Sequence, residues 1–174
     1  MYFRQWLRRR WIGLYMKIVR EKASPEYIAR GWAIGMFCGC LIPFGFQLVC
    51  SIPMAFAMKG SKIGATLGTM LTNHVTIFFI YPAQCFVGSR LLGGTLSFRE
   101  IEEAFGDVIK NQDYETLFSL SGELIAAFFV GGVLLTLVTT PLTYVAVLKL
   151  VRAYRRRRER RAAAKAAKAA KQTR

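Results

Sequence analysis

The chain has 174 residues and a formal net charge of +15, and 53% of its residues are hydrophobic, so its charge and its apolar residues must be separated along the sequence. This length leaves room for one compact domain and excludes a separate soluble catalytic module. The chain has four cysteines, all inside apolar stretches and without metal-ligand spacing: Cys38, Cys40, Cys50 and Cys85. We therefore expect them to be buried packing residues, and we expect no metal or other cofactor.

Residues 1–23 are predicted to form a basic amphipathic helix at the cytoplasmic face of a membrane. Trp6, Trp11 and Tyr15 alternate with Arg and Lys residues, a mixture typical of helices that lie at a membrane interface. We therefore expect membrane lipids as partners, with anionic headgroups attracted to the basic ends of the chain by about 1 kcal/mol per charge near the surface.

Three long stretches contain no Asp, Glu, Lys or Arg: Gly31–Met58, Ile63–Ser89 and Leu124–Leu148. Each is longer than the roughly 20 residues that a membrane helix needs. A charged residue at the centre of such a helix costs about 2.5 to 3.5 kcal/mol, so their absence is informative. The pattern predicts an all-α integral membrane protein with residues 24–150 as the membrane domain.

The first apolar stretch is interrupted at its centre by Pro43, Phe44 and Gly45. Each half covers about 18 Å, roughly half of a hydrocarbon core about 30 Å thick. Proline removes a backbone donor and glycine permits a turn, so this stretch fits a re-entrant hairpin. The alternative is a full span that is kinked at Pro43.

Charge favours the re-entrant form. Met1–Arg30 holds eight basic residues and Lys149–Arg174 holds twelve, so both termini are expected in the cytoplasm. Three simple spans would place the termini on opposite sides. We therefore expect a hairpin over 31–58 followed by two transmembrane helices, with Ile63–Ser89 running outward and Leu124–Leu148 returning.

The segment between the last two stretches is acidic, since Arg90–Glu123 carries seven of the ten acidic residues. Within residues 97–123, apolar positions recur at helical spacing, which predicts an amphipathic loop helix on the outer side with its carboxylates in solvent. Residues 151–174 are predicted to form a basic, helical, cytoplasmic tail. We expect this tail to act at the membrane surface rather than to bind nucleic acid.

Polar residues at mid-membrane depth are the candidates for a substrate site: Pro43, Gly45, Gln47, Asn73, His74 and Thr76. A half-helix beginning near Gly45 would present backbone N–H groups to an anionic group, as broken helices do in transporters. Bonding between helices is the alternative role for Gln47 and Asn73. No Asp or Glu lies in an apolar stretch and nothing orients Ser51 with His74, so we expect no catalytic residues and no enzyme.

Two rows of small residues are predicted to be helix-packing faces. Gly31, Gly35 and Gly39 repeat every four residues in the first stretch, and Gly64 and Gly68 do so in the second. Small residues at this spacing let helix backbones approach closely in lipid.

Several short motifs occur in a recognisable order: Ser24-Pro25, Gly35, the run Pro43-Phe44-Gly45-Phe46-Gln47, Asn73-His74-Val75-Thr76 and Gly88. Their order resembles the bacterial membrane family catalogued as domain of unknown function twenty sixty-two, over roughly Ser24 to Leu150. In that family the second motif usually reads Asn-Pro-x-Thr, whereas this chain has His74 at the proline position. The resemblance implies a small inner-membrane protein without an established activity, whose relatives are sometimes joined to glycosyltransferase domains.

Two functions are compatible with these features. The first is transport or binding of an anionic, lipid-phosphate-like substrate near mid-membrane. The alternative is a non-catalytic membrane adaptor or scaffold, which would hold a partner such as a membrane-associated glycosyltransferase through its glycine faces and basic ends. Assembly with further copies of the chain is compatible with either function.

Overall fold

The computed structural model describes residues 23–43, 45–70, 74–95, 97–101 and 122–172. Within these ranges the regular structure is helical and no strand occurs, so the all-α fold is confirmed. The basic helix expected over 1–23 lies outside the described residues, and so does most of the acidic loop. The main helices are α2 (Pro25–Leu41), α3 (Gln47–Ala57), α4 (Lys62–Thr69), α5 (His74–Leu91) and α8 (Gly122–Gln172).

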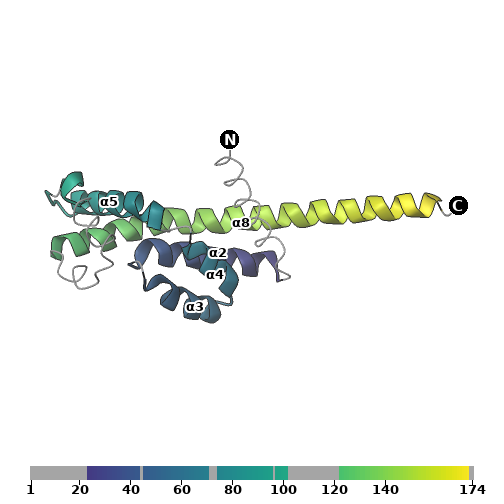
Figure 1. Ribbon diagram of the computed structural model, residues 1–174, viewed down its shortest axis with the longest axis horizontal. Coiled ribbons are helices and arrows are strands. Elements are labelled where there is room, and N and C mark those ends of the chain that lie inside the picture. The colour runs from purple at the N-terminus through teal and green to yellow at the C-terminus, as the bar shows by residue number, and fades with distance from the viewer. Residues whose placement is uncertain (1–22, 44, 71–73, 96, 102–121, 173–174) are drawn as a thin grey trace.

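Helix α8 forms the long axis of the molecule (Figure 1). Its 51 residues extend over about 77 Å and join the third apolar stretch to the basic tail without a break. Among the helices described, α8 is the one that is long and apolar enough to cross a membrane, and 33% of its most apolar window is buried in the protein. Most of that window therefore faces outward.

The break predicted at Pro43–Gly45 is present. Helix α2 ends at Leu41, Gly45 has a φ of 99°, and α3 begins at Gln47. The backbone N–H of Ser61, just beyond α3, donates to the carbonyl oxygen of Tyr27 in the first turn of α2 at 3.0 Å. Helices α2 and α3 thus form an antiparallel hairpin, with α2 lying between α3 and α8 (Figure 1).

The second apolar stretch differs from the single span that we expected, because it contains two helices. Helix α4 ends at Thr69 after 8 residues, about 12 Å, and α5 begins at His74. The two helices serve different neighbours: α4 packs on α2 and α3, whereas α5 packs on α8. Tertiary packing therefore divides a stretch whose composition alone is compatible with one helix.

Buried apolar clusters hold the helices to α8 at two levels. Near the basic end, Ile28 and Trp32 of α2 pack with Val147 and Val151 of α8. Near the start of α8, a second cluster joins α5 to α8 and to the short helix around residue 101, and it contains Tyr81, Cys85, Ile101, Leu124 and Phe128. These clusters fix α2 and α5 along different parts of the same helix.

Candidate functional site

A buried polar cluster lies where the hairpin turns. The side-chain amide nitrogen of Gln47 donates to the carbonyl oxygens of Gly39 at 3.0 Å and Ile42 at 3.2 Å, and it lies 3.0 Å from the hydroxyl of Tyr81. That hydroxyl also donates to the Ile42 carbonyl at 3.3 Å. Gln47 is 4% exposed and Tyr81 is 2% exposed, so these bonds form away from solvent. The cluster therefore links the turn between α2 and α3 to α5 through hydrogen bonds.

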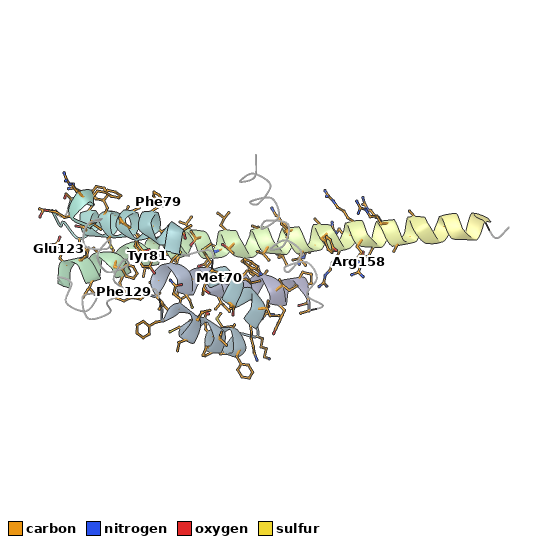
Figure 2. All side chains as sticks on the ribbon, viewed as in Figure 1. Met70, Phe79, Tyr81, Glu123, Phe129 and Arg158 are labelled. Atoms are coloured by element: carbon orange, nitrogen blue, oxygen red, sulfur yellow. The ribbon has the colours of Figure 1, made fainter. Side chains whose placement is uncertain are left out.

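Tyr81 is a member of this cluster that the sequence analysis did not single out. Its ring packs edge-on against Phe128 of α8, with centroids 4.9 Å apart and planes at 82°, and Figure 2 shows it beside α8. A tyrosine inside an apolar stretch carries a hydroxyl that needs a partner once it is buried. The hydroxyl's need for a buried partner could have marked Tyr81 as a candidate from the sequence, but it could not identify Gln47 as that partner.

The other candidate residues are only partly described. Pro43 is half-buried and Gly45 is exposed in the turn, and Thr76 is half-buried in α5. Asn73 lies outside the described residues, and of His74 only its place as the first residue of α5 is described. The expected meeting of Gln47 and Asn73 therefore stays a prediction.

Helix α3 begins directly after the turn, at Gln47. Phe46 occupies the cap position and makes no side-chain capping hydrogen bond, and its backbone N–H donates to Pro43 at 3.3 Å. The first turn of a helix carries the positive end of its dipole. This terminus lies next to the Gln47 cluster.

Glycines bring α2 and α4 into backbone contact. A Cβ built on Gly35 would lie 2.2 Å from the carbonyl oxygen of Ala65 and 2.7 Å from the Cα of Gly68, and one on Gly31 would lie 2.2 Å from the Ser61 carbonyl oxygen. Gly64 faces the ring of Trp32. The two glycine rows thus meet inside the chain. Gly39 is buried and contributes its carbonyl oxygen to Gln47.

A second close approach joins α5 to α8. A Cβ on Gly88 would lie 1.9 Å from the Ala127 carbonyl oxygen, and one on Gly131 would lie 1.9 Å from that of Gln84. Gln84 is 4% exposed, and its amide nitrogen donates to the Phe128 carbonyl at 2.8 Å while its Oε1 has no hydrogen-bond partner. Gly131 lay in an apolar stretch without the four-residue repeat that identified the other packing glycines.

Charged residues gather where α2 begins and the apolar part of α8 ends. Glu26 accepts a hydrogen bond from Arg152 at 2.6 Å, and Arg155 donates to the Ala23 carbonyl oxygen. The hydrogen bond from Arg152 holds the pKa of Glu26 below its ordinary value. Lys62 lies over the Phe56 ring at 4.9 Å, at the same end of the hairpin. This end is therefore strongly basic, and α8 is tied to α2 there.

The opposite end of α8 carries different chemistry. Ser97 and Glu100 form a reciprocal capping box, in which the Ser97 N–H donates to the Glu100 carboxylate at 2.8 Å and the Glu100 N–H donates to the Ser97 hydroxyl at 3.3 Å. The bonds from Ser97 lower the pKa of Glu100. Ser89 donates to Glu123 at 3.4 Å, which closes α5 onto the first turn of α8.

The comparisons with known proteins identify a family and no close relative. No curated protein and no solved structure matches the chain. Within the described part of the chain, no three His, Cys, Asp or Glu side chains gather as metal ligands would. The family model described as "uncharacterized protein conserved in bacteria" (DUF2062) matches residues 8–160. The order of Ser24-Pro25, the Pro43–Gln47 turn and Gly88 therefore has its explanation: the chain belongs to this bacterial family.

Proposed function

We propose that the chain is a multi-pass protein of the bacterial inner membrane and acts as a non-catalytic adaptor. One observation carries the proposal: α8 is a single helix whose apolar part is packed against α2 and α5 while its basic part extends beyond both (Figure 1). Such a helix joins a membrane-embedded bundle directly to a charged surface in the cytoplasm. Both termini are cytoplasmic in this proposal, in keeping with their basic residues.

The register along α8 supports a re-entrant hairpin. A Cβ on Gly132 would lie 3.3 Å from the Cys40 carbonyl oxygen, so α2 ends at the level of Gly132. That level is about 26 Å along α8 from Lys149, the first charge after the apolar part, and about 14 Å short of Glu123 at the other end. In the proposed orientation the hairpin enters from the cytoplasm and turns back before the outer face.

The outer surface of the bundle supports burial in lipid. Large apolar side chains on three helices are two-thirds or more exposed: Val49, Phe56, Phe79, Leu137 and Leu142. Exposed apolar area of this extent marks contact with a membrane or a partner protein. The polar groups of Gln47 and Tyr81 are instead turned inward and bonded to the fold.

An adaptor fits these contacts better than a transporter does. The Gln47 amide is engaged by two carbonyl oxygens and the Tyr81 hydroxyl, which is the role of interhelical bonding. The glycine faces of α2, at Gly35, and α4, at Gly68, pack against each other, so neither is open to a partner. A partner, such as the membrane-associated glycosyltransferase that the resemblance implies or a second copy, would therefore meet the exposed apolar faces or the basic tail.

Thiol labelling tests the membrane placement. Cys50, which is exposed and not buried as we expected, is replaced by Ala, while Cys38, Cys40 and Cys85 stay because they are buried. Single cysteines then replace the exposed residues Lys62, Arg158 and Thr95. An impermeant reagent should label positions 62 and 158 only in inverted vesicles and position 95 only in intact cells. Labelling of position 62 from outside would exclude the re-entrant hairpin.

The adaptor role is tested in a strain that lacks the gene for this protein, by asking which variants restore the phenotype lost in that strain. Removal of residues 156–174 should abolish rescue, whereas Gln47→Ala, compared at an equal amount of membrane-inserted protein, should retain it. The opposite result would favour substrate binding at the hairpin turn. Thermal unfolding of each purified variant serves as the control for folding.

Binding of an anionic group at the turn is the second candidate function, and the observation in its favour is the start of α3, which lacks a side-chain cap. Its ligand would be a lipid phosphate. Lipids that copurify with the parent protein and with a Phe46→Asp variant would be compared by mass spectrometry, because an acidic side chain at the cap competes for the same N–H groups. Equal recovery of phospholipid from both proteins would exclude this site.

A further inference from the structure

The section of α8 from residue 156 to residue 172, called here the basic rod, carries a dense positive charge. It contains eight Lys or Arg residues and a single acid, Glu159, along about 26 Å. Arg156, Arg157 and Arg158 are exposed, and at about 100° per residue the eight basic positions fall within an arc of about 200° around the helix, while Glu159 and most of the alanines lie on the opposite face. Figure 2 shows Arg158 on the part of α8 that lies beyond the other helices.

The direction of the basic rod points it away from the lipid surface. It continues α8 without a Gly or Pro after Pro141, and Arg152 and Arg155, just before the basic rod, tie α8 to the start of α2. Residue 165 lies about 24 Å beyond Lys149 along the helix. The screening length is about 8 Å at physiological salt, so anionic headgroups exert little attraction at that distance.

The side chains of the basic rod restrict the class of partner. Between its charged residues the sequence has only alanine, apart from Gln172, and it has no apolar side chain larger than a methyl group. Helices that lie in a membrane interface need a face of Trp, Phe or Leu. Grooves in proteins are likewise occupied by large apolar or aromatic anchors. A polyanion needs neither of these, because phosphate neutralisation supplies the affinity.

Contrary to the expectation from the sequence, which favoured the membrane surface, we propose that the basic rod binds the phosphate backbone of duplex nucleic acid, without sequence preference. An α-helix fits the major groove, which is about 12 Å wide, and alanines keep this helix narrow between its basic residues. With the basic arc of about 200° turned into the groove, cations reach the phosphates on both of its walls while the alanine face points outward, and bZIP basic regions are likewise continuous helices that cross the major groove. The basic rod thus becomes the docking part of the proposed adaptor, and the inference rests on that function.

Binding is measured on the full chain in nanodiscs of zwitterionic lipid, with a fluorescent 20-base-pair duplex of random sequence and anisotropy as the readout. We expect affinity to fall steeply between 50 and 200 mM KCl, with a slope of about 0.9 per neutralised phosphate. The variant Arg160→Gln with Arg161→Gln should lower that slope by about two. From the same relation its affinity should fall about thirtyfold at 0.15 M salt. Glutamine has nearly the helix propensity of arginine, so the helix persists.

A matched control removes two charges elsewhere at the same end of the molecule. Lys59→Gln with Lys62→Gln alters two exposed residues, one in the link after α3 and one at the first position of α4, and should leave the affinity within about twofold of the parent value. Equal loss in both double variants, or no loss in the rod variant, would overturn the proposal. Circular dichroism of each variant is the control for folding, and the helix content should equal that of the parent protein.

Two competitors separate the other classes of partner. Polyglutamate of equal charge should compete weakly with the duplex, and equally tight binding of polyglutamate would assign the basic rod to acidic proteins instead. Nanodiscs with one-third anionic lipid should retain duplex binding, and its loss there would assign the basic rod to the membrane surface. Because the duplex assay does not depend on sidedness, its failure is distinguishable from failure of the thiol-labelling test of the proposed function.

Discussion

The contact between α2 and α4 can be tested by adding one methyl group to it. In Gly35→Ala the new Cβ would lie 2.2 Å from the Ala65 carbonyl oxygen, whereas ordinary contact begins at 3.4 Å. The three nearest atoms belong to the α4 backbone, in Ala65, Gly68 and Thr69, and no side-chain rotation can relieve the overlap. Helix α4 must therefore move away from α2 by about 1 Å.

The cost of that movement can be estimated. Overpacking costs about 1 to 3 kcal/mol, and a clash with backbone atoms, which no side-chain rotation relieves, belongs at the upper end of this range. The higher helix propensity of alanine returns about 1 kcal/mol. The net loss for Gly35→Ala is therefore about 2 kcal/mol, a change of about thirtyfold in the ratio of folded to unfolded protein.

Unfolding of the full chain in mixed micelles, followed by circular dichroism as the fraction of denaturing detergent rises, measures this loss. Gly122→Ala is the matched control, because among the described residues outside its own helical turn no atom lies within 4 Å of a Cβ at that position, and the residue opens α8. The control should be as stable as the parent or slightly more stable. If Gly35→Ala unfolded within about 0.5 kcal/mol of the control, α2 and α4 could not be in the backbone contact described.

The same assay tests three further predictions. Gln47→Met should lower the free energy of unfolding by about 1 to 2 kcal/mol, because the amide of Gln47 donates to Ile42 and Tyr81. A loss no larger than that of the Gln84→Met variant described next would contradict this. Gln84→Met should be nearly neutral, since losing the bond to Phe128 is offset by removing the unpartnered Oε1, and a cost above about 2 kcal/mol would refute that balance. Because the pKa of Glu26 is lowered in the folded protein, its pairing with Arg152 stabilises the fold fully above the ordinary carboxyl pKa, about 4.3, and this stabilisation is lost as pH falls through the lowered pKa. The stability advantage of the parent over Glu26→Gln should therefore vanish in acid. An advantage that did not change with pH would contradict the pairing.

Features that depend on neighbouring residues in the sequence were predictable. Ser24 accepts a hydrogen bond from the N–H of Tyr27 at 3.2 Å and Pro25 occupies the first turn, so this motif begins α2. The hairpin turn follows from Pro43 and Gly45, whose backbone chemistry interrupts a helix without reference to the rest of the fold.

Features that depend on which helices become neighbours were not predictable. The composition of Ile63–Ser89 gives no sign that its first part packs on α2 and its second part on α8. Tyr81 and Gln47 are far apart in sequence, and neither indicates the other until the hairpin is placed against α5. Hydropathy separates the apolar part of α8 from the basic tail, yet both belong to one helix, because alanine, arginine and lysine favour helix as strongly as leucine does.

The contacts of Arg152 and Arg155 add to the apolar packing of Val147 and Val151 that couples the basic part of α8 to the hairpin. These residues lie three positions apart on α8, and their partners, Glu26 and the Ala23 carbonyl oxygen, lie at or just before the start of α2. The same helix α2 is fixed to α4 through Gly35 and to α3 through the turn held by Gln47. A force on the basic rod would therefore reach the hairpin through α2, and loss of the arginine contacts would weaken this coupling without separating the helices, because Ile28 and Trp32 remain packed on Val147 and Val151.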